Sequence, residues 1–161
     1  NKLEVWTVAH LFETTDDTLY NIALIQIRPY NSDIVYVAEL ELLGSLKDGL
    51  DFALLSFDIP PTIENVIKKG DLPRAGEDLH MVGHPFGVCQ WAYSYGRCSE
   101  PLRFDGNIWE IEAILPAEPG NSGGGVFNAD GELLGLLSAK QGAYASIVPL
   151  SRIEAFLDTK P

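Results

Sequence analysis

Glycines surround one serine in the segment EPGNSGGG, residues 118–125. Each glycine in a regular element costs roughly 0.5–1 kcal/mol relative to alanine, because the chain gives up backbone order there. A serine hydroxyl is a poor nucleophile unless a base removes its proton, and the oxyanion that follows needs hydrogen-bond donors aimed at it. Small residues around Ser122 would let the N–H groups of Gly120 and Ser122 converge as such donors. A plain glycine-rich hairpin turn would have the same composition.

The chain has three histidines, and His10 is the best candidate for the base. It ends the apolar run VWTVAH, where a strand could hold its imidazole at a cleft, although a histidine buried at a strand end would look the same. A base also needs a carboxylate that fixes its tautomer and orientation. Asp51 opens the apolar run DFALLSF, an expensive place for a charge without a partner, although hydrogen bonds to loop amides would also explain it. The weaker candidates in polar or proline-rich loops are Asp16, Asp17 and Asp58.

The charge balance limits the classes of partner. The 161 residues include 23 acidic and 11 basic side chains, giving a net charge of −12. This balance disfavours nucleic acid and anionic membrane surfaces, and it indicates a solvated acidic surface that could steer basic peptides. The apolar runs are far shorter than the ~20 residues of a membrane span, so we expect a soluble protein. No targeting segment is visible in the first ten residues, and the compartment stays open.

Short apolar runs separated by turn signals predict an all-β fold. We expect two units, at residues 1–60 and 77–161, joined by an inter-barrel linker at 61–76 that is rich in proline and charge. The tail at 151–159 changes to a helical period and predicts one short C-terminal helix, with Ser151 and Glu154 as its capping box. The predicted strands lie in segments 2–8, 18–28, 33–43 and 51–57 of the first unit and in 78–84, 89–97, 107–115, 124–128, 131–139 and 144–150 of the second.

The other residues that could form a disulfide or bind a metal give little indication of either. Cys89 and Cys98 are too few for a disulfide framework, and they could either pair across a hairpin or stay free. His80 and His84 have the spacing of a metal pair, but a strand followed by a turn does not put them on one face, and no third ligand is evident. We therefore expect no metal site and no cofactor.

Three motifs in the order His, Asp, Ser make the chain resemble the chymotrypsin-like serine peptidases. TVAH is similar to the family's Thr-Ala-Ala-His signature, DFAL to its Asp-hydrophobic-Ala-Leu strand, and GNSGG to its Gly-Xaa-Ser-Gly-Gly loop. The resemblance implies a serine endopeptidase that cleaves a polypeptide substrate through an acyl-enzyme. It assigns His10 as general base, Asp51 as the carboxylate that orients it, Ser122 as nucleophile, and the amides of Gly120 and Ser122 as the oxyanion hole. The alternative is a silent peptidase-fold module that binds peptide or scaffolds an assembly.

Longer segments look closer to the bacterial HtrA-like and related trypsin-like peptidase domains: MVGHPFG, AEPGNSGGGVFNADGELLGLLSA and ASIVPLSRIEAFL. This resemblance implies two six-stranded antiparallel Greek-key barrels and a short C-terminal helix. Only four strands are predicted in the first barrel, so we expect an upstream segment or another chain to supply its first strands. Digestive relatives carry an acidic residue before the nucleophile, where Asn121 stands here, so we do not expect activation by N-terminal cleavage.

The same resemblance places the walls of the primary pocket at residues 114–118, 137–140 and 142–146. Pro116 stands where trypsin-like pockets hold an aspartate, and segment 137–140 has no histidine of the kind that glutamate-selective relatives use. We therefore expect the pocket to accept a small or medium apolar side chain. The residues implied to line it are Pro116, Ser138, Ala139, Lys140 and Ala145.

Overall fold

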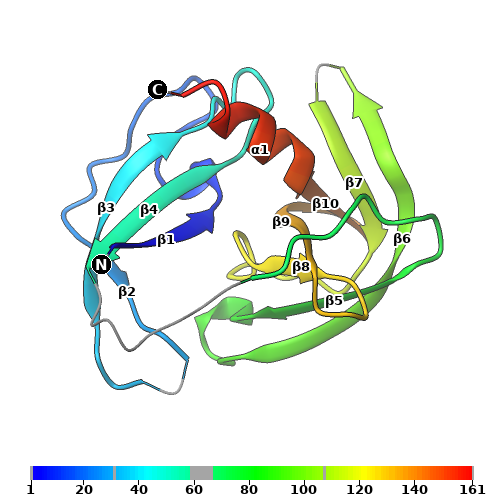
Figure 1. Ribbon diagram of the computed structural model, residues 1–161, viewed down its shortest axis with the longest axis horizontal. Helices are drawn as coiled ribbons and strands as arrows, with labels where there is room; N and C mark the ends of the chain where they lie inside the picture. Colours follow the sequence, from blue (N-terminus) through cyan, green and yellow to red (C-terminus); the bar gives the residue numbers. More distant parts are fainter. Residues whose placement is uncertain (1, 31, 59–66, 107, 161) are drawn as a thin grey trace.

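The computed structural model describes residues 2–30, 32–58, 67–106 and 108–160. These residues form a four-stranded antiparallel sheet and a closed six-stranded antiparallel barrel, with one α-helix near the C-terminal end (Figure 1). The predicted all-β class is confirmed, as is the division into four strands and then six. The arrangement is consistent with the chymotrypsin-like fold.

The first half of the chain forms the four-stranded sheet, in the order β1-β4-β3-β2. One face carries an apolar cluster that includes Ala38, Leu55 and Phe57, and Phe12 packs into it from the loop after β1. Because β1 and β2 are the outer strands, this sheet does not close on itself. The strands are β1 (Lys2–Thr7), β2 (Ile25–Ile27), β3 (Tyr36–Leu43) and β4 (Ala53–Asp58).

Strand β2 is much shorter than the strand predicted over residues 18–28. Ile25–Ile27 pair with Tyr36–Ala38 of β3, whereas Leu19 upstream makes only an isolated antiparallel bridge with Glu13. Among the apolar side chains upstream, Leu19 and Leu24 are exposed. An apolar run becomes a strand only where a neighbouring strand takes up its N–H and C=O groups, and segment 18–24 lies beyond that pairing.

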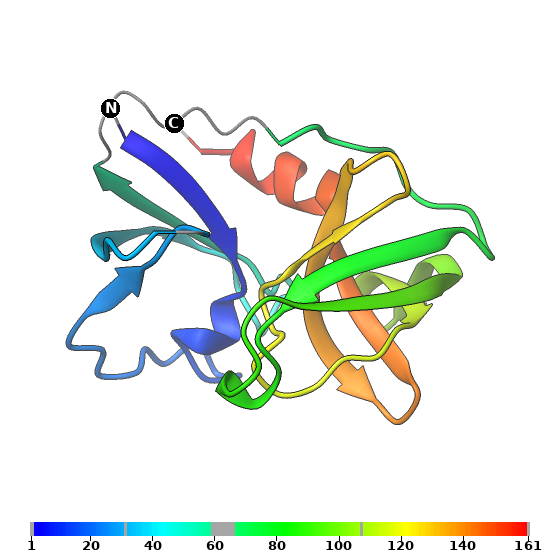
Figure 2. The ribbon, with the colours of Figure 1, turned by 90° about the horizontal axis from the view of Figure 1, so that it is seen from below.

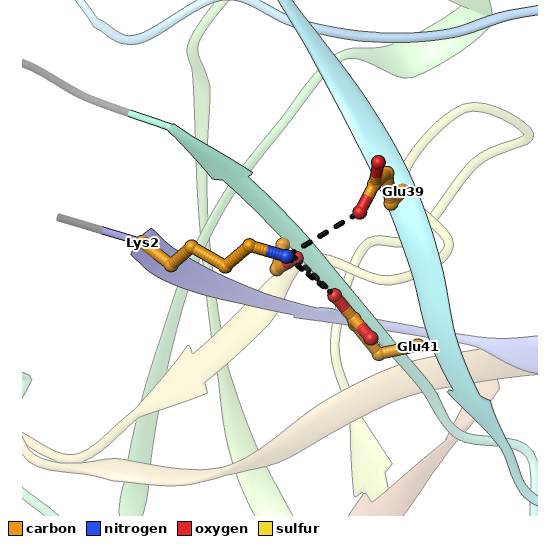
Figure 3. A network of polar contacts seen from close by, with 4 residues as sticks. Lys2, Glu39 and Glu41 are labelled. Atoms are coloured by element: carbon orange, nitrogen blue, oxygen red, sulfur yellow. Dashed lines mark hydrogen bonds and ion pairs between the residues drawn. The ribbon is translucent and has the colours of Figure 1, made fainter.

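A polar network on the opposite face of this sheet joins three of its strands (Figure 3). Lys2 of β1 reaches across β4, and its Nζ lies 3.3 Å from both Glu39 Oε2 and Glu41 Oε1 of β3. The hydroxyl oxygen of Ser56, on β4, lies 3.5 Å from the same nitrogen and also donates to Glu41. The network is consistent with the register in which Ser56 stands opposite Glu39, and its exposed charges contribute little to stability.

The second half forms the closed barrel, in the cyclic order β10-β7-β6-β5-β8-β9. Its interior is filled by buried apolar side chains, among them Leu79, Met81, Ile111, Val126 and Ile147. Closure gives every strand two neighbours, so the barrel has no free edge strand to template aggregation. The strands are β5 (Asp78–Gly83), β6 (Ala92–Asp105), β7 (Ile108–Ile114), β8 (Gly125–Phe127), β9 (Leu133–Gln141) and β10 (Tyr144–Pro149).

The helix α1 (Leu150–Leu157) lies between the sheet and the barrel (Figures 1 and 2). The predicted helix is confirmed, but its predicted start at Ser151 is wrong. Pro149 is the N-terminal flanking residue, in an extended conformation, and no side chain caps the helix. Strand β10 therefore runs directly into the helix, and Ser151 already belongs to the first helical turn. The apolar cluster between the halves, called here the shared core, is made of Val8, Leu50, Phe52, Leu54, Leu136, Val148 and Ile153.

The predicted linker, 61–76, falls partly on residues 59–66, which lie outside the described residues. Its described part is hydrogen-bonded to the start of β9: Gly70 N–H donates to Leu133 O at 2.9 Å, and Leu133 N–H donates to Lys68 O at 2.8 Å. The division into units at 1–60 and 77–161 stays a proposal. No helix in the described part of the chain has the length and apolar character that crossing a membrane requires.

Candidate active site

His10 and Asp51 come from different loops of the first half and meet through two hydrogen bonds. His10 lies in the 3₁₀ turn η1 (Ala9–Leu11), directly after β1, and Asp51 lies just before β4. The His10 backbone N–H donates to Asp51 Oδ1 at 2.9 Å, and the ring Nδ1 lies 2.7 Å from Asp51 Oδ2. The carboxylate therefore fixes both the backbone and the ring of His10. This geometry favours the tautomer with the proton on Nδ1, which leaves Nε2 as an acceptor.

The same contacts shift both pKa values. The hydrogen bond to Asp51 raises the pKa of His10 above its ordinary value, against the opposing effect of burial. Burial alone would raise the pKa of Asp51, but hydrogen bonds from His10 and Ser138 outweigh it and hold that pKa below its ordinary value. At neutral pH Asp51 is thus an anion beside an imidazole that takes up a proton more readily than a free one.

Ser138 connects this pair to Ser122. Its hydroxyl donates to Asp51 Oδ2 at 2.5 Å, and its carbonyl accepts the hydroxyl of Ser122 at 3.5 Å. The structure therefore gathers the three residues predicted to carry the chemistry around one residue of β9. Within the described residues no hydrogen bond joins Ser122 Oγ to His10.

The loop that carries Ser122 contains two glycines that no other residue could replace without strain. Gly120 has φ +98°, and a Cβ there would lie 2.3 Å from His84 O in the turn before η2 (Pro85–Gly87). Gly123 has φ +84°, and a Cβ there would lie 2.1 Å from Thr7 Oγ1 at the end of β1. The loop is therefore packed between the barrel turn and the strand that leads to His10, which explains the glycines on either side of the serine.

The backbone of this loop has a defined orientation. Pro119 O accepts the N–H of Phe86 at 2.5 Å. Because the peptide is trans, the Gly120 N–H points away from that contact. Within the described part of the chain, the N–H groups of Gly120 and Ser122 donate to no acceptor. Asn121 between them is buried, and its N–H donates to Glu118 O at 3.0 Å.

The five residues predicted to line the primary pocket have different environments. Ser138 turns its hydroxyl toward Asp51, so its side chain supports the acidic residue. Ala139 and Pro116 are exposed, and Lys140 pairs with Glu118. Ala145 is fully buried in the barrel core, so its side chain does not reach the surface.

The structure also brings residues to the site that the sequence gave no reason to select. The carboxyl of Glu13, three residues after His10, is 4% exposed, and its Oε1 has no hydrogen-bond partner within the described residues. A cavity of about 280 Å³ opens beside His10 and Asp51, and Trp109 and Arg152 also line it. A larger cavity of about 440 Å³ lies between β1 and β8 and touches neither member of the pair. No local motif marks Trp109 and Arg152, because both come from elements that are distant in the chain.

Within the described residues, the side chains of the other histidines and of the cysteines make no hydrogen bond to His10, Asp51 or Ser122. His80 Nδ1 contacts the Tyr93 hydroxyl at 2.6 Å, and the His84 ring packs edge-on against Trp91. No three potential metal-binding side chains cluster within the described ranges. Both cysteines are free, and burial together with the nearby Glu77 raises the pKa of Cys98 to about 11.

Comparison with known proteins gives one family and two informative relatives. The model of the trypsin-like peptidase domain family matches residues 2–136. The periplasmic pH-dependent serine endoprotease DegQ of Escherichia coli is 35% identical over 106 residues, 63% of this chain. A probable periplasmic serine endoprotease, DegP-like, of Halomonas elongata is 27% identical over 146 residues, 80% of this chain. The matched segments make up 23% and 31% of those two proteins, so the chain spans less than a third of each.

Proposed function

The chain belongs to the trypsin-like peptidase domain family, and from this premise we propose that it is a serine endopeptidase with Ser122, His10 and Asp51 as its triad. The observation that carries the proposal is the pair of hydrogen bonds from His10 to Asp51, with Ser138 linking Asp51 to Ser122. A half-buried histidine and a buried carboxylate held in this way match the requirements of a general base for a hydroxyl nucleophile.

In the proposed reaction, Ser122 Oγ attacks the carbonyl carbon of a peptide bond while His10 Nε2 accepts its proton. The Gly120 and Ser122 N–H groups stabilise the oxyanion, and Asp51 stabilises the imidazolium. His10 then donates the proton to the leaving amine, which leaves an ester on Ser122. Water deprotonated by the same imidazole hydrolyses that ester and restores the free hydroxyl.

Before the first step, the Ser122 side chain has to rotate from the Ser138 carbonyl toward His10. Catalytic hydrogen bonds are often loose in the absence of substrate and tighten when substrate binds. The long contact of 3.5 Å to Ser138 is compatible with such a rotation, because little hydrogen-bond energy is lost.

One observation favours a second candidate, a peptide-binding module without turnover: Ser122 is not hydrogen-bonded to the imidazole within the described residues. In that case the same cleft would hold a polypeptide, and Ser122 would have no general base.

An active-site-directed fluorophosphonate distinguishes the two candidates. The endopeptidase predicts covalent labelling of the wild-type protein that is lost in Ser122→Ala and kept in Ser99→Ala, whose serine is exposed on β6. Circular dichroism checks that all three proteins are folded. A folded wild-type protein that stays unlabelled would support the binding module.

A further inference from the structure

A guanidinium group lines the cavity beside His10 and Asp51. The cavity has a volume of about 280 Å³, and Arg152 of α1 forms part of its wall. Arg152 Nη1 donates to two backbone carbonyls, Gly49 O at 2.7 Å and Trp109 O at 3.1 Å. These contacts hold the arginine between the loop before Asp51 and strand β7, so the fold fixes its position.

Arg152 lacks the carboxylate partner that a half-buried charge ordinarily has. It makes no ion pair within the described residues, whereas Arg103, which is also half-buried, pairs with Glu112. Burial lowers the pKa of Arg152, and no acidic side chain in the described part of the chain offsets that effect. Because taking a charge out of water is costly without a partner, the cavity carries a positive charge that the described residues leave uncompensated.

The remaining donors of Arg152 have the geometry of a carboxylate site. A guanidinium presents five N–H donors in one planar fork. The two backbone contacts use Nη1, and no acceptor within the described residues takes up the donors on Nε and Nη2. Nε and Nη2 share one edge of the fork, and two parallel N–H groups of this kind bind both oxygens of a single carboxylate.

The rest of the wall suits one peptide side chain. Leu46, Ile108 and Val148 line the cavity and can pack against methylene groups. Pockets for drug-sized ligands occupy about 300–1,000 Å³, so a cavity of about 280 Å³ is better matched to a side chain than to a large molecule. His10 lines the same cavity, so a side chain bound there would lie beside the proposed general base.

Two acidic side chains also line the cavity and oppose the binding of an anion. Asp51 is already engaged, because its two carboxylate oxygens accept hydrogen bonds from His10 and Ser138. Glu110 makes no ion pair within the described residues, so its charge would act directly on an incoming carboxylate. Arg152 and Glu110 should therefore have opposite effects on the affinity for an acidic ligand.

We propose that this cavity binds the carboxylate side chain of a glutamate in a polypeptide, through Nε and Nη2 of Arg152. Glutamate is preferred to aspartate because its additional methylene group can contact the apolar wall. As a statement about substrates, the inference rests on the proposed function and predicts a glutamate near the scissile bond. The binding itself requires no turnover.

Calorimetry on Ser122→Ala measures this binding without cleavage. The two ligands are acetylated and amidated hexapeptides of alanine that contain one glutamate or one glutamine. The glutamate peptide should bind about tenfold more tightly, because hydrogen bonds to charged groups contribute at this level. Arg152→Gln should abolish the preference, and Arg152→Lys should keep part of it, because lysine retains the charge without the fork. Glu110→Gln should increase the preference.

Arg28→Gln is the matched control, because it removes the same charge from an arginine that contacts Gln90 at 2.8 Å, and it should leave the preference unchanged. Equal affinity for the two peptides in Ser122→Ala would overturn the site. A preference that survives in Arg152→Gln, folded by circular dichroism, would overturn the assignment to Arg152. If Arg152→Gln does not fold, an unchanged preference in Glu110→Gln would overturn the assignment to this cavity.

Two further measurements separate the peptide from other sources of a carboxylate and from the proposed function. Butyrate, a free carboxylate of similar length, should bind more weakly than the glutamate peptide, and tighter binding of butyrate would overturn the assignment to a polypeptide. If the wild-type protein does not react with the fluorophosphonate, the endopeptidase is refuted. The affinities of the two peptides for Ser122→Ala would still decide whether the cavity binds glutamate.

Discussion

The contact between His10 and Asp51 makes a prediction at the scale of single residues. In Asp51→Asn the hydrogen bond that raises the pKa of His10 loses its charged acceptor, so that pKa should fall below the wild-type value. NMR titration of the His10 ring protons measures this shift without any substrate. For the proposed reaction, kcat/KM should fall roughly 10⁴-fold, and its acidic limb should move to lower pH, because the imidazole stays neutral at lower pH.

Asp78→Asn is a matched control for this experiment. Asp78 also carries a pKa lowered by side-chain contacts, chiefly from Tyr95, but it lies on β5 away from His10. The Asp78→Asn substitution should leave the pKa of His10 at its wild-type value. An unchanged His10 pKa in Asp51→Asn would contradict the structural contact itself.

Glu13 makes an independent prediction about stability. Burial above all, and then the charge of Asp17, raise the pKa of this carboxyl. The folded state thus holds the proton more tightly than the unfolded chain, so Glu13 costs stability as pH rises from below about 4.5 through the raised pKa. Glu13→Gln carries no charge at any pH, and its amide oxygen can still accept the Leu46 N–H that Glu13 accepts.

Urea unfolding at pH 4 and pH 7 measures this effect. Relative to wild type, Glu13→Gln should gain free energy of unfolding at pH 7 and gain less at pH 4. An exposed, uncharged residue provides the control: Gln26→Asn on β2 should give the same difference from wild type at both pH values, because neither side chain titrates. Equal gains at both pH values for Glu13→Gln would show that the pKa of this carboxyl is the same in the folded and unfolded states, which would contradict the expected upward shift.

At this scale the sequence identifies the groups with intrinsic chemistry but not their supporting contacts. Ser122 is selected because glycines surround it, and Asp51 because it opens an apolar run, although a plain turn or hydrogen bonds to loop amides would explain the same residues. The role of Ser138 is different, because its hydroxyl reaches Asp51 only after β9 is placed beside the first half. Glu13 and the partner of Lys140 are missed for the same reason: burial and pairing are set by segments far away in the chain.

Among the elements, the start of α1 is the clearest departure from the sequence-based expectation, and it gives a prediction. Ser151 lies inside the first helical turn, and no side chain caps the helix. Ser151→Ala should therefore change the free energy of unfolding by less than about 0.5 kcal/mol, whereas loss of a true capping serine costs about 1 kcal/mol. Thermal and urea unfolding measure the difference. A loss of about 1 kcal/mol in the free energy of unfolding would show that Ser151 does cap the helix.

The strands show why element type is easier to predict than element bounds. Four runs before the linker and six after it become strands, because alternating or continuous apolar residues identify a buried sheet. Where a strand begins and ends depends instead on the neighbouring strands that pair with it. Strand β2 begins only at Ile25, because β3 pairs with no residue before it. Strand β6 continues to Asp105, because β7 pairs with it up to that residue. The helix starts one residue early because Pro149 links it directly to β10.

Over the whole molecule, the two halves differ in how they enclose apolar side chains. The barrel closes on itself, while the four-stranded sheet has two outer strands and leaves residues such as Val37 and Leu24 exposed. The shared core buries part of the apolar surface that the open sheet would leave uncovered, because side chains from both halves and from α1 pack together there. His10 and Asp51 lie at this junction, so the geometry of the site depends on the two halves staying packed.

This dependence gives a prediction for Ile153, which is fully buried on α1 in the shared core. Ile153→Ala should lower the free energy of unfolding by about 2–5 kcal/mol through lost burial and the cavity left behind. The amides of β4 and β9 should lose protection from hydrogen exchange together, because the core joins the sheet to the barrel. Val37→Ala, at an exposed position, should leave both readouts near wild type. If protection fell in β9 alone, the sheet would be stable without the barrel and the two halves would unfold as separate units.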